Sequence, residues 1–228
     1  HATVMWRLKN CDPVLKITII PRGRSLGATW YLPEERANHN VEHFMHKMAG
    51  LLGGRVAEQQ LMGITSTGAI NDLERTSKTA YAMVAYYGMS PKVGNISFYD
   101  ASGQRDTFTK PFSERTAELI DEEVRRIVEE AVTLTREIIE QERANIERLA
   151  DILIEKETIF TEDIEAVLGI SAQQLAKQEA EAAKRAAEAE VKSVEAVEEA
   201  VEVAEPTTPA EPTTPAEPTD PAAPTDKE

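Results

Sequence analysis

The chain has 228 residues and carries 40 acidic against 25 basic side chains, which gives a formal net charge of −15. No basic face stands out against that charge, so we expect no binding to nucleic acid. Cys11 is the only cysteine, which excludes an internal disulfide, and no apolar run approaches the ~20 residues that a membrane-spanning helix needs.

The beginning of the chain predicts the end of a helix followed by a β-hairpin. Residues 2–9 are mostly apolar and read as the last turns of a helix. The β-branched run at residues 14–20 predicts a strand. A turn signal at residues 21–24 separates it from residues 27–32, which predict a returning strand.

Two helical segments are predicted next. Residues 41–62 have a helical pattern, which we expect to be interrupted at Gly53 and Gly54. The same glycine pair would permit another segment to approach closely, because neither residue carries a Cβ atom. A Ser/Thr/Gly loop at residues 64–70 leads to a second helix over residues 71–87, whose apolar residues have helical spacing.

A long amphipathic helix is predicted from Ser113, which provides an N-cap before an acidic first turn. Its apolar residues recur at steps of four and three and form a stripe suited to packing on a neighbouring helix. The stripe consists of Ile120, Val124, Ile127, Ala131, Leu134 and Ile138. The polar residues 140–143 predict a kink or turn, and Thr161 opens a last short helix that ends at Gly169.

The composition changes near residue 170 and divides the chain into three parts. We expect a mainly α domain with a small β-hairpin over residues 1–169. An Ala/Glu-rich extension, compatible with a helix, covers residues 170–204. Residues 205–222 repeat Glu-Pro-Thr-Thr-Pro-Ala, with the third copy changed to Glu-Pro-Thr-Asp-Pro-Ala, and this density of proline predicts a disordered tail over residues 205–228. Residues 171–228 hold 14 of the acidic but only 5 of the basic residues.

His1 opens the first apolar segment in the position of the second histidine of an H-E-x-x-H helix. In that motif two histidines on one helix face hold a zinc ion, and the glutamate serves as general base. The first histidine and the base would then precede residue 1, so we expect residues 1–228 alone to be inactive. The plainer alternative is an ordinary surface histidine.

Six sequence blocks, in matching order and spacing across residues 1–169, resemble the FtsH-type proteases. These are membrane-anchored, ATP-dependent zinc metalloproteases. The blocks are residues 16–27, 32–35, 51–58, 66–75, 87–90 and 153–158. The resemblance implies a helical zinc-metalloprotease domain with a small β-hairpin, followed by a tail that lies outside the similarity.

The resemblance also implies the ligands of the metal. His1 and Asp72 would bind zinc, which accepts a carboxylate oxygen beside imidazole nitrogens, and Glu58 would orient a ligating histidine without touching the metal. The simpler alternative for Asp72 is a helix-start residue favoured by the helix dipole. Glu58 could equally be a surface carboxylate or pair with Arg55.

The predicted hairpin is a candidate substrate site, with Ile17, Ile19, Gly27 and Thr29 as its substrate-binding residues. An exposed strand edge binds an extended peptide through main-chain hydrogen bonds, whatever the sequence of that peptide. The alternative is a hairpin that only covers the helical core.

For the intact protein, the resemblance implies a preceding ATPase module that uses ATP and magnesium, a membrane anchor and a homo-hexamer. Its substrates would be unfolded or membrane proteins, and its place the cytoplasmic face of the bacterial inner membrane. We recognise none of these further parts in residues 1–228.

Two other hypotheses compete with this one. His39, Glu42 and His43 fit the inverted zinc motif H-x-x-E-H, although the residues around His39 are too polar for a buried helix. A hypothesis from another class is a non-catalytic helical module for oligomerisation or interaction, with the proline-rich tail as a spacer or partner-binding segment.

Overall fold

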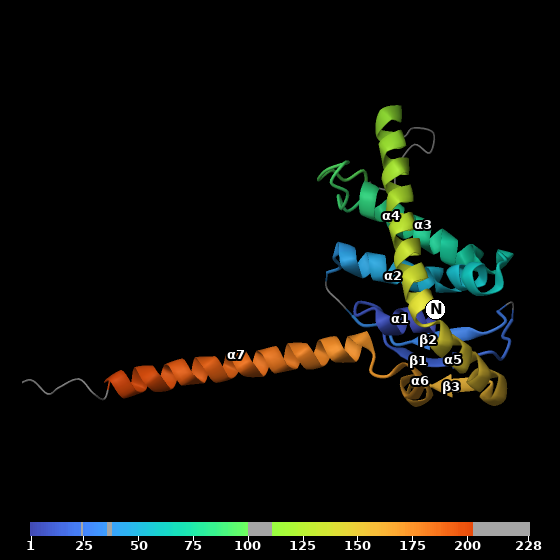
Figure 1. Ribbon diagram of the computed structural model, residues 1–228. Coiled ribbons are helices and arrows are strands. Elements are labelled where there is room, and N and C mark those ends of the chain that lie inside the picture. The colour runs from blue at the N-terminus through green and yellow to red at the C-terminus, as the bar shows by residue number, and fades with distance from the viewer. Residues whose placement is uncertain (24, 36–37, 100–110, 203–228) are drawn as a thin grey trace, which may run out of the picture. The chain divides into compact units, whose positions relative to one another are not determined.

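The computed structural model describes residues 1–23, 25–35, 38–99 and 111–202 (Figure 1). The predicted disordered tail therefore lies outside the described residues. One compact unit runs from His1 to Glu181. It is mainly helical with one small sheet, as the sequence predicts.

Four helices build the larger hydrophobic core: α1 (Ala2–Arg7), α2 (Val41–Ala57), α3 (Ile70–Ala85) and α4 (Glu114–Gln141). The long helix α4 crosses α2 and α3, and α2 also packs on α1 (Figure 1). The apolar stripe of α4 faces this core, where its most buried members are Ile120, Ile127, Ala131 and Ile138. The stripe is thus buried by contacts within the chain, and little of its surface is left to pack on a partner helix.

Helix α2 differs from the prediction in one respect. The sequence pattern predicted an interruption at Gly53 and Gly54, but the helix continues through both residues. It then passes into a π-helical turn, Glu58–Met62, which ends at Gly63 with a left-handed backbone conformation. The prediction failed because glycine in a helix interior costs only about 1 kcal/mol relative to alanine, and packing around α2 outweighs that cost.

The sheet has three antiparallel strands in the order β2-β1-β3: β2 (Ala28–Tyr31), β1 (Val14–Thr18) and β3 (Thr158–Phe160). Strands β1 and β2 form the predicted hairpin, with Ile17 opposite Thr29. Strand β3 pairs with the other side of β1 and was not predicted, because three residues are too few to show an alternating pattern. Among the described strands β2 therefore forms one edge of the sheet.

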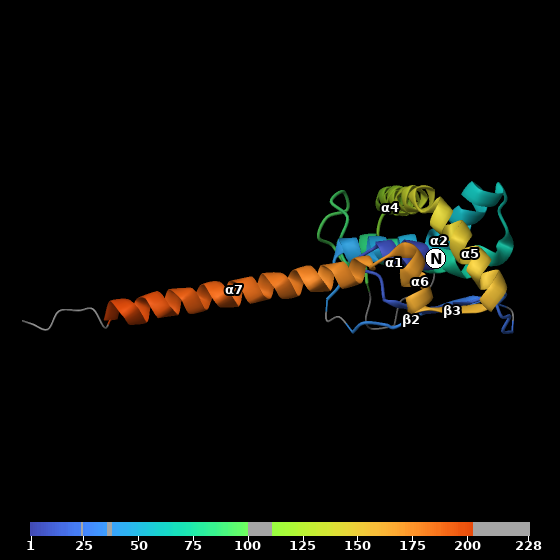
Figure 2. The ribbon, with the colours of Figure 1, turned by 60° about the horizontal axis from the view of Figure 1, so that its bottom comes forward.

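A second core lies between the sheet, α1 and two further helices, α5 (Arg143–Lys156) and α6 (Thr161–Leu168). Its buried members are Ala2, Trp6, Val14, Leu149, Ile159, Ile164 and Leu168. Figure 2 shows the strands along one side of the helices. The break between α4 and α5 falls at Glu142, where the polar stretch predicted it. Helix α1 contributes to both cores, which fixes its N-terminal end.

Helix α7 (Ala172–Glu202) covers most of the predicted Ala/Glu-rich extension. Its first turn is tied to α1: the buried side-chain amide of Gln173 donates to the carbonyls of Met5 (2.6 Å) and Leu8 (2.8 Å). The Trp6 indole N–H donates to the Gly169 carbonyl at 2.9 Å. The compact unit consequently extends beyond residue 169. Within the described ranges, no helix combines the length and apolarity needed to span a membrane.

Candidate metal centre and substrate groove

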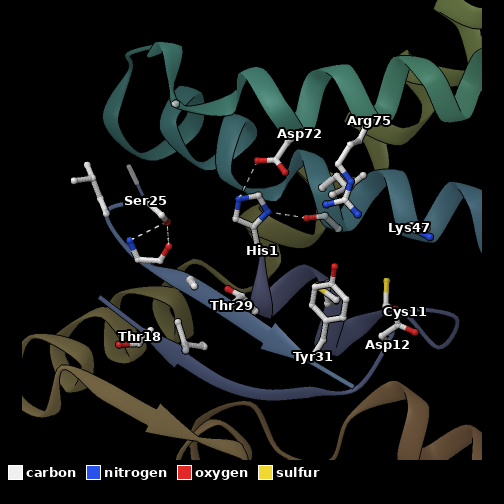
Figure 3. A pocket seen from close by; sticks show the side chains of 18 of the residues that line it. His1, Cys11, Asp12, Thr18, Ser25, Thr29, Tyr31, Lys47, Asp72 and Arg75 are labelled. Atoms are coloured by element: carbon white, nitrogen blue, oxygen red, sulfur yellow. Dashed lines mark hydrogen bonds and ion pairs between the residues drawn. The ribbon is translucent and has the colours of Figure 1, made fainter. Parts of the chain in front are cut away.

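The imidazole of His1 lies between α2 and α3 (Figure 3). Its Nδ1 is 2.9 Å from the carbonyl oxygen of Gly50. Since a carbonyl only accepts hydrogen bonds, Nδ1 must carry the proton. In the neutral ring Nε2 then has a free lone pair, and this atom is 3.8 Å from Oδ2 of Asp72. The two predicted ligands are therefore brought together, and in the neutral ring Nε2 is the nitrogen that is open to a metal.

The glycine pair on α2 makes room for His1. A Cβ atom at Gly54 would be 2.5 Å from Nε2 of His1, and one at Gly53 would be 2.9 Å from its Cα. Real Cβ atoms essentially never approach other atoms so closely. The close approach expected from the sequence thus occurs, and the residue that approaches the glycine pair is His1, the candidate metal ligand.

Asp72 is placed by the start of α3. A 3₁₀ turn, Thr67–Ala69, precedes the helix, and the Ser66 hydroxyl caps this turn by accepting from the Gly68 amide at 3.2 Å. Asp72 then falls in the first turn of α3, where the helix dipole favours a negative charge. Its side chain is 26% exposed, against 36% for His1. Both groups are therefore accessible from the solvent.

Glu58 contacts the loop that leads to Asp72. Its carboxylate accepts from the Ser66 amide at 3.0 Å and from the Ser66 hydroxyl at 2.7 Å. These hydrogen bonds are the main reason why the pKa of Glu58 is lowered. Arg55 donates to the Ser66 carbonyl at 2.8 Å and lies 3.8 Å from Glu58. Glu58 therefore holds the Asp72 loop in place, and its orientation of a histidine stays a prediction.

The donor pair fits two positions of a zinc site. Two ligand atoms at zinc bond lengths of 2.0–2.2 Å and a tetrahedral angle are about 3.4 Å apart, close to the observed 3.8 Å between Nε2 of His1 and Oδ2 of Asp72. Catalytic zinc sites use three protein ligands. Within the described part of the chain, no three His, Cys, Asp or Glu side chains gather suitably for a metal, so a third ligand would have to come from elsewhere.

His1 and Asp72 open into a groove of about 790 Å³ between the sheet and helices α2 and α3. Three of the predicted substrate-binding residues line it: Ile17, Gly27 and Thr29. Figure 3 shows Thr29 of β2 beside His1. Ile19 is not among the described lining residues; its amide donates to the Glu157 carbonyl at 3.0 Å. The edge strand β2 thus runs along the groove next to the candidate metal ligands.

Sequence reasoning missed several other groove residues, among them Lys47, Arg75, Asp12 and Tyr31. Arg75 could have been found, because it follows Asp72 by three residues on the same helix and so shares its face. Lys47 and Asp12 come from distant parts of the chain and carried no such signal.

The residues of the inverted motif are arranged differently. The rings of His39 and His43 stack with their centroids 4.2 Å apart, and His43 is buried in the first turn of α2. Glu42 is directed to Lys9, at 3.0 Å, and to His46, at 3.9 Å. The carboxylate of the motif is therefore engaged with cationic and imidazole groups other than its two histidines.

Comparison with known proteins identifies the class of the chain, that of FtsH-type zinc-metalloprotease domains. Residues 1–167 match the model of peptidase family M41, and the chain belongs to this family.

Three relatives illustrate the similarity. The chain is 47% identical over 179 residues to the ATP-dependent zinc metalloprotease FtsH of Parabacteroides distasonis, covering 78% of this chain and 26% of that protein. It is 49% identical over 172 residues to the FtsH of Rhodothermus marinus, covering 74% and 25%. It is 45% identical over 170 residues to the mouse mitochondrial inner membrane m-AAA protease component AFG3L1, covering 74% and 21%. The chain spans about a quarter of the length of these curated relatives.

Proposed function

We propose that residues 1–169 are the peptidase domain of a membrane-anchored, ATP-dependent zinc metalloprotease that degrades unfolded or membrane proteins. The observation that carries this proposal is the pairing of His1 with Asp72 in an open groove: Nε2 of His1 faces the carboxylate oxygen Oδ2 at 3.8 Å. A surface histidine or an ordinary helix-start aspartate would need neither the glycine pair of α2 nor the fixed tautomer.

In this proposal His1 and Asp72 hold the zinc ion, together with a histidine that precedes residue 1. The bound ion supplies a Lewis acid and lowers the pKa of a water molecule to near neutrality. The Gly50 carbonyl keeps the Nδ1 proton of His1 in place, so that Nε2 remains a donor to the metal. Glu58 and Arg55 keep the Asp72 loop in position through Ser66. The general base is the glutamate of the H-E-x-x-H motif, also before residue 1.

The edge strand β2 provides the substrate site. Its free edge offers main-chain groups to an extended peptide, which would add a strand beside the metal ligands. Such binding depends little on side chains, as a protease that degrades many proteins requires. Thr29 and Tyr31, two residues apart on β2, both line the groove and would contact a peptide bound there.

The further parts of the proposed protein lie outside residues 1–228. An ATPase module using ATP and magnesium would unfold the substrate, a membrane anchor would hold the protein at the cytoplasmic face of the bacterial inner membrane, and six copies would assemble. Two relatives are named ATP-dependent, and the mouse relative is named a component of the mitochondrial inner membrane m-AAA protease. These names support the proposal by relationship.

The test compares residues 1–228 with a longer polypeptide that includes the upstream residues. The longer form should cleave casein in a chelator-sensitive manner, and Asp72→Asn should remove that activity. Residues 1–228 alone should show negligible cleavage, because they supply two metal ligands and lack the base. Chelator-sensitive casein cleavage by residues 1–228 would contradict the placement of the base, and an upstream sequence without His-Glu would favour a non-catalytic module.

A further inference from the structure

The groove has two arms that differ in charge. Figure 3 shows Ser25 and Thr18 on one side of His1. On the other side it shows the lining residues that carry a charge or a phenolic hydroxyl group: Asp12, Tyr31, Lys47 and Arg75. We refer to the side with these four residues as the charged arm.

The two cations of the charged arm lie one helical turn from the candidate metal ligands. Arg75 follows Asp72 by three residues on α3, and Lys47 precedes Gly50, the partner of His1, by three residues on α2. Three residues correspond to about 4.5 Å along a helix axis. An extended peptide advances about 3.3 Å per residue, so both cations lie within reach of a substrate residue one or two positions from the cleaved bond.

The cations are available to a ligand. Lys47 and Arg75 are both exposed, and neither pairs with a carboxylate of the described residues. Other cations of the chain are engaged, such as Arg7, 2.8 Å from Glu142. Asp12 is the acidic member of the charged arm, and its Oδ1 accepts from the Glu34 amide at 3.1 Å. The arm therefore has an excess of positive charge in a chain that is acidic as a whole.

We propose that the charged arm selects substrate segments with a carboxylate one or two residues from the cleaved bond. This inference rests on the proposed function, because it requires the groove to bind peptides. The guanidinium of Arg75 offers a planar pair of donors that matches a carboxylate, and Lys47 adds a second charge. Strand β2 binds the main chain, so selectivity has to come from side-chain contacts of this kind. The carboxylate belongs to Asp or Glu, or to the C-terminus of the substrate.

The test measures peptide binding to the full chain of 228 residues, and so needs neither zinc nor catalysis. Fluorescent octapeptides with blocked ends differ only in Glu, Gln or Lys at one position, which is moved along the peptide. By fluorescence anisotropy we expect the best Glu peptide to bind roughly three- to fivefold more tightly than its Gln counterpart. Added salt should reduce this preference. A neutral peptide with a free C-terminus, compared with its amide, separates the two sources of the carboxylate.

Variants assign the preference to the two cations. Arg75→Gln and Lys47→Gln should each reduce it, and the double variant should bind Glu and Gln peptides equally while keeping its affinity for the Gln peptide. Arg148→Gln, an exposed change on α5 away from the groove, is the matched control and should keep the full preference.

The possible failures are distinct. Equal binding of Glu and Gln peptides by the unchanged protein overturns the charge selection but leaves the groove as a peptide site. A preference that survives in the double variant overturns its assignment to Lys47 and Arg75. The absence of binding for all peptides overturns both this inference and the proposed role of the groove.

Discussion

Two carboxylates on adjacent helices, Asp72 on α3 and Glu123 on α4, have opposite surroundings. Glu123 is 1% exposed and accepts from three side chains: the Ser90 hydroxyl at 2.8 Å, Lys92 at 2.8 Å and Arg126 at 3.0 Å. The hydrogen bonds from Arg126, aided by Lys92 and Ser90, outweigh the effect of burial and lower the pKa of Glu123 to about 2. The protein itself thus satisfies this carboxylate, which fastens the irregular segment after α3 to α4.

Asp72 is instead left with unused acceptor capacity. The nitrogen paired with it among the described residues is Nε2 of His1, at 3.8 Å, whereas a charge-assisted hydrogen bond is about 2.7–2.9 Å long. A metal ligand must keep its oxygen lone pairs free for the ion. The two carboxylates thus differ in their partners: donors from the protein surround Glu123, whereas Asp72, the candidate metal ligand, is open to water or to an external ion.

The largest expected effect is the loss of proteolysis in Asp72→Asn, which should leave the stability of the fold unchanged. In the full-length protein Asp72→Asn should reduce proteolysis by more than about a hundredfold, since even residues that only support metal ligands are worth 10–100-fold. Its free energy of unfolding should change by less than about 0.5 kcal/mol, as for other partly exposed sites. Casein cleavage and urea unfolding measure the two quantities. A large loss of stability would mean that Asp72 is a structural residue.

The converse change is Glu123→Gln. It removes the negative charge to which Ser90, Lys92 and Arg126 donate, and should lower the free energy of unfolding by about 3 kcal/mol, since hydrogen bonds to a charged group contribute about 1.5–3 kcal/mol. Glu130→Gln is the matched control, because Glu130 pairs with the same Arg126 at the surface; it should cost no more than about 0.5 kcal/mol. Urea unfolding at neutral pH measures both variants. Equal costs would show that burial of Glu123 contributes nothing.

The free energy of unfolding should depend on pH through the same carboxylate, Glu123. The pKa of Glu123 falls from 4.5 to about 2 on folding, so the unfolded chain binds more protons between these values. Its stabilising effect is therefore fully present above about pH 4.5 and is lost as the pH falls toward 2. At about 1.4 kcal/mol per pKa unit, the loss amounts to roughly 3 kcal/mol.

The measurement is urea unfolding of the unchanged protein and of Glu123→Gln between pH 7 and pH 3. The difference between the two proteins should shrink steadily below pH 4.5. A difference that is constant over this range would contradict the lowered pKa.

The smallest of these effects tests the space around His1. Gly54→Ala places a Cβ atom 2.5 Å from Nε2 of His1, so the imidazole must move. We expect zinc affinity in the full-length protein to fall by roughly 10–100-fold. Gly68→Ala is a milder control in the same groove, since its Cβ would be 3.3 Å from the Ser66 hydroxyl and so needs only a small shift. Titration with zinc measures both, and unchanged affinity in Gly54→Ala would show that the glycine is not needed for the metal.

The sequence predicted those features of the fold and of the candidate site that follow from local patterns or from the family resemblance. The long helix from Ser113, its break near Glu142 and the hairpin have local signals, and the structure confirms them. The roles of His1 and Asp72 came from the resemblance, because no spacing rule joins residues so far apart in the chain.

The remaining features depend on tertiary contacts. Glu123 looks like any exposed acid of an amphipathic helix, and its burial results from a meeting with Ser90 and Lys92 that no periodicity encodes. Gly53 and Gly54 read as helix breakers because the residue that packs against them lies fifty positions away. The charge of the groove was missed for the same reason, since Lys47 comes from a different helix than Arg75.

The contacts of Gln173 have a practical consequence for anyone who prepares this domain. At the end of α1 the carbonyls of Met5 and Leu8 accept from Gln173 in addition to backbone amides. A fragment trimmed at residue 167, where the match to the family model stops, would lose this amide and also the Gly169 carbonyl that accepts from the Trp6 indole. The end of α1 would then lose three of its hydrogen bonds, so a fragment that ends near residue 181, with the compact unit, is the better choice.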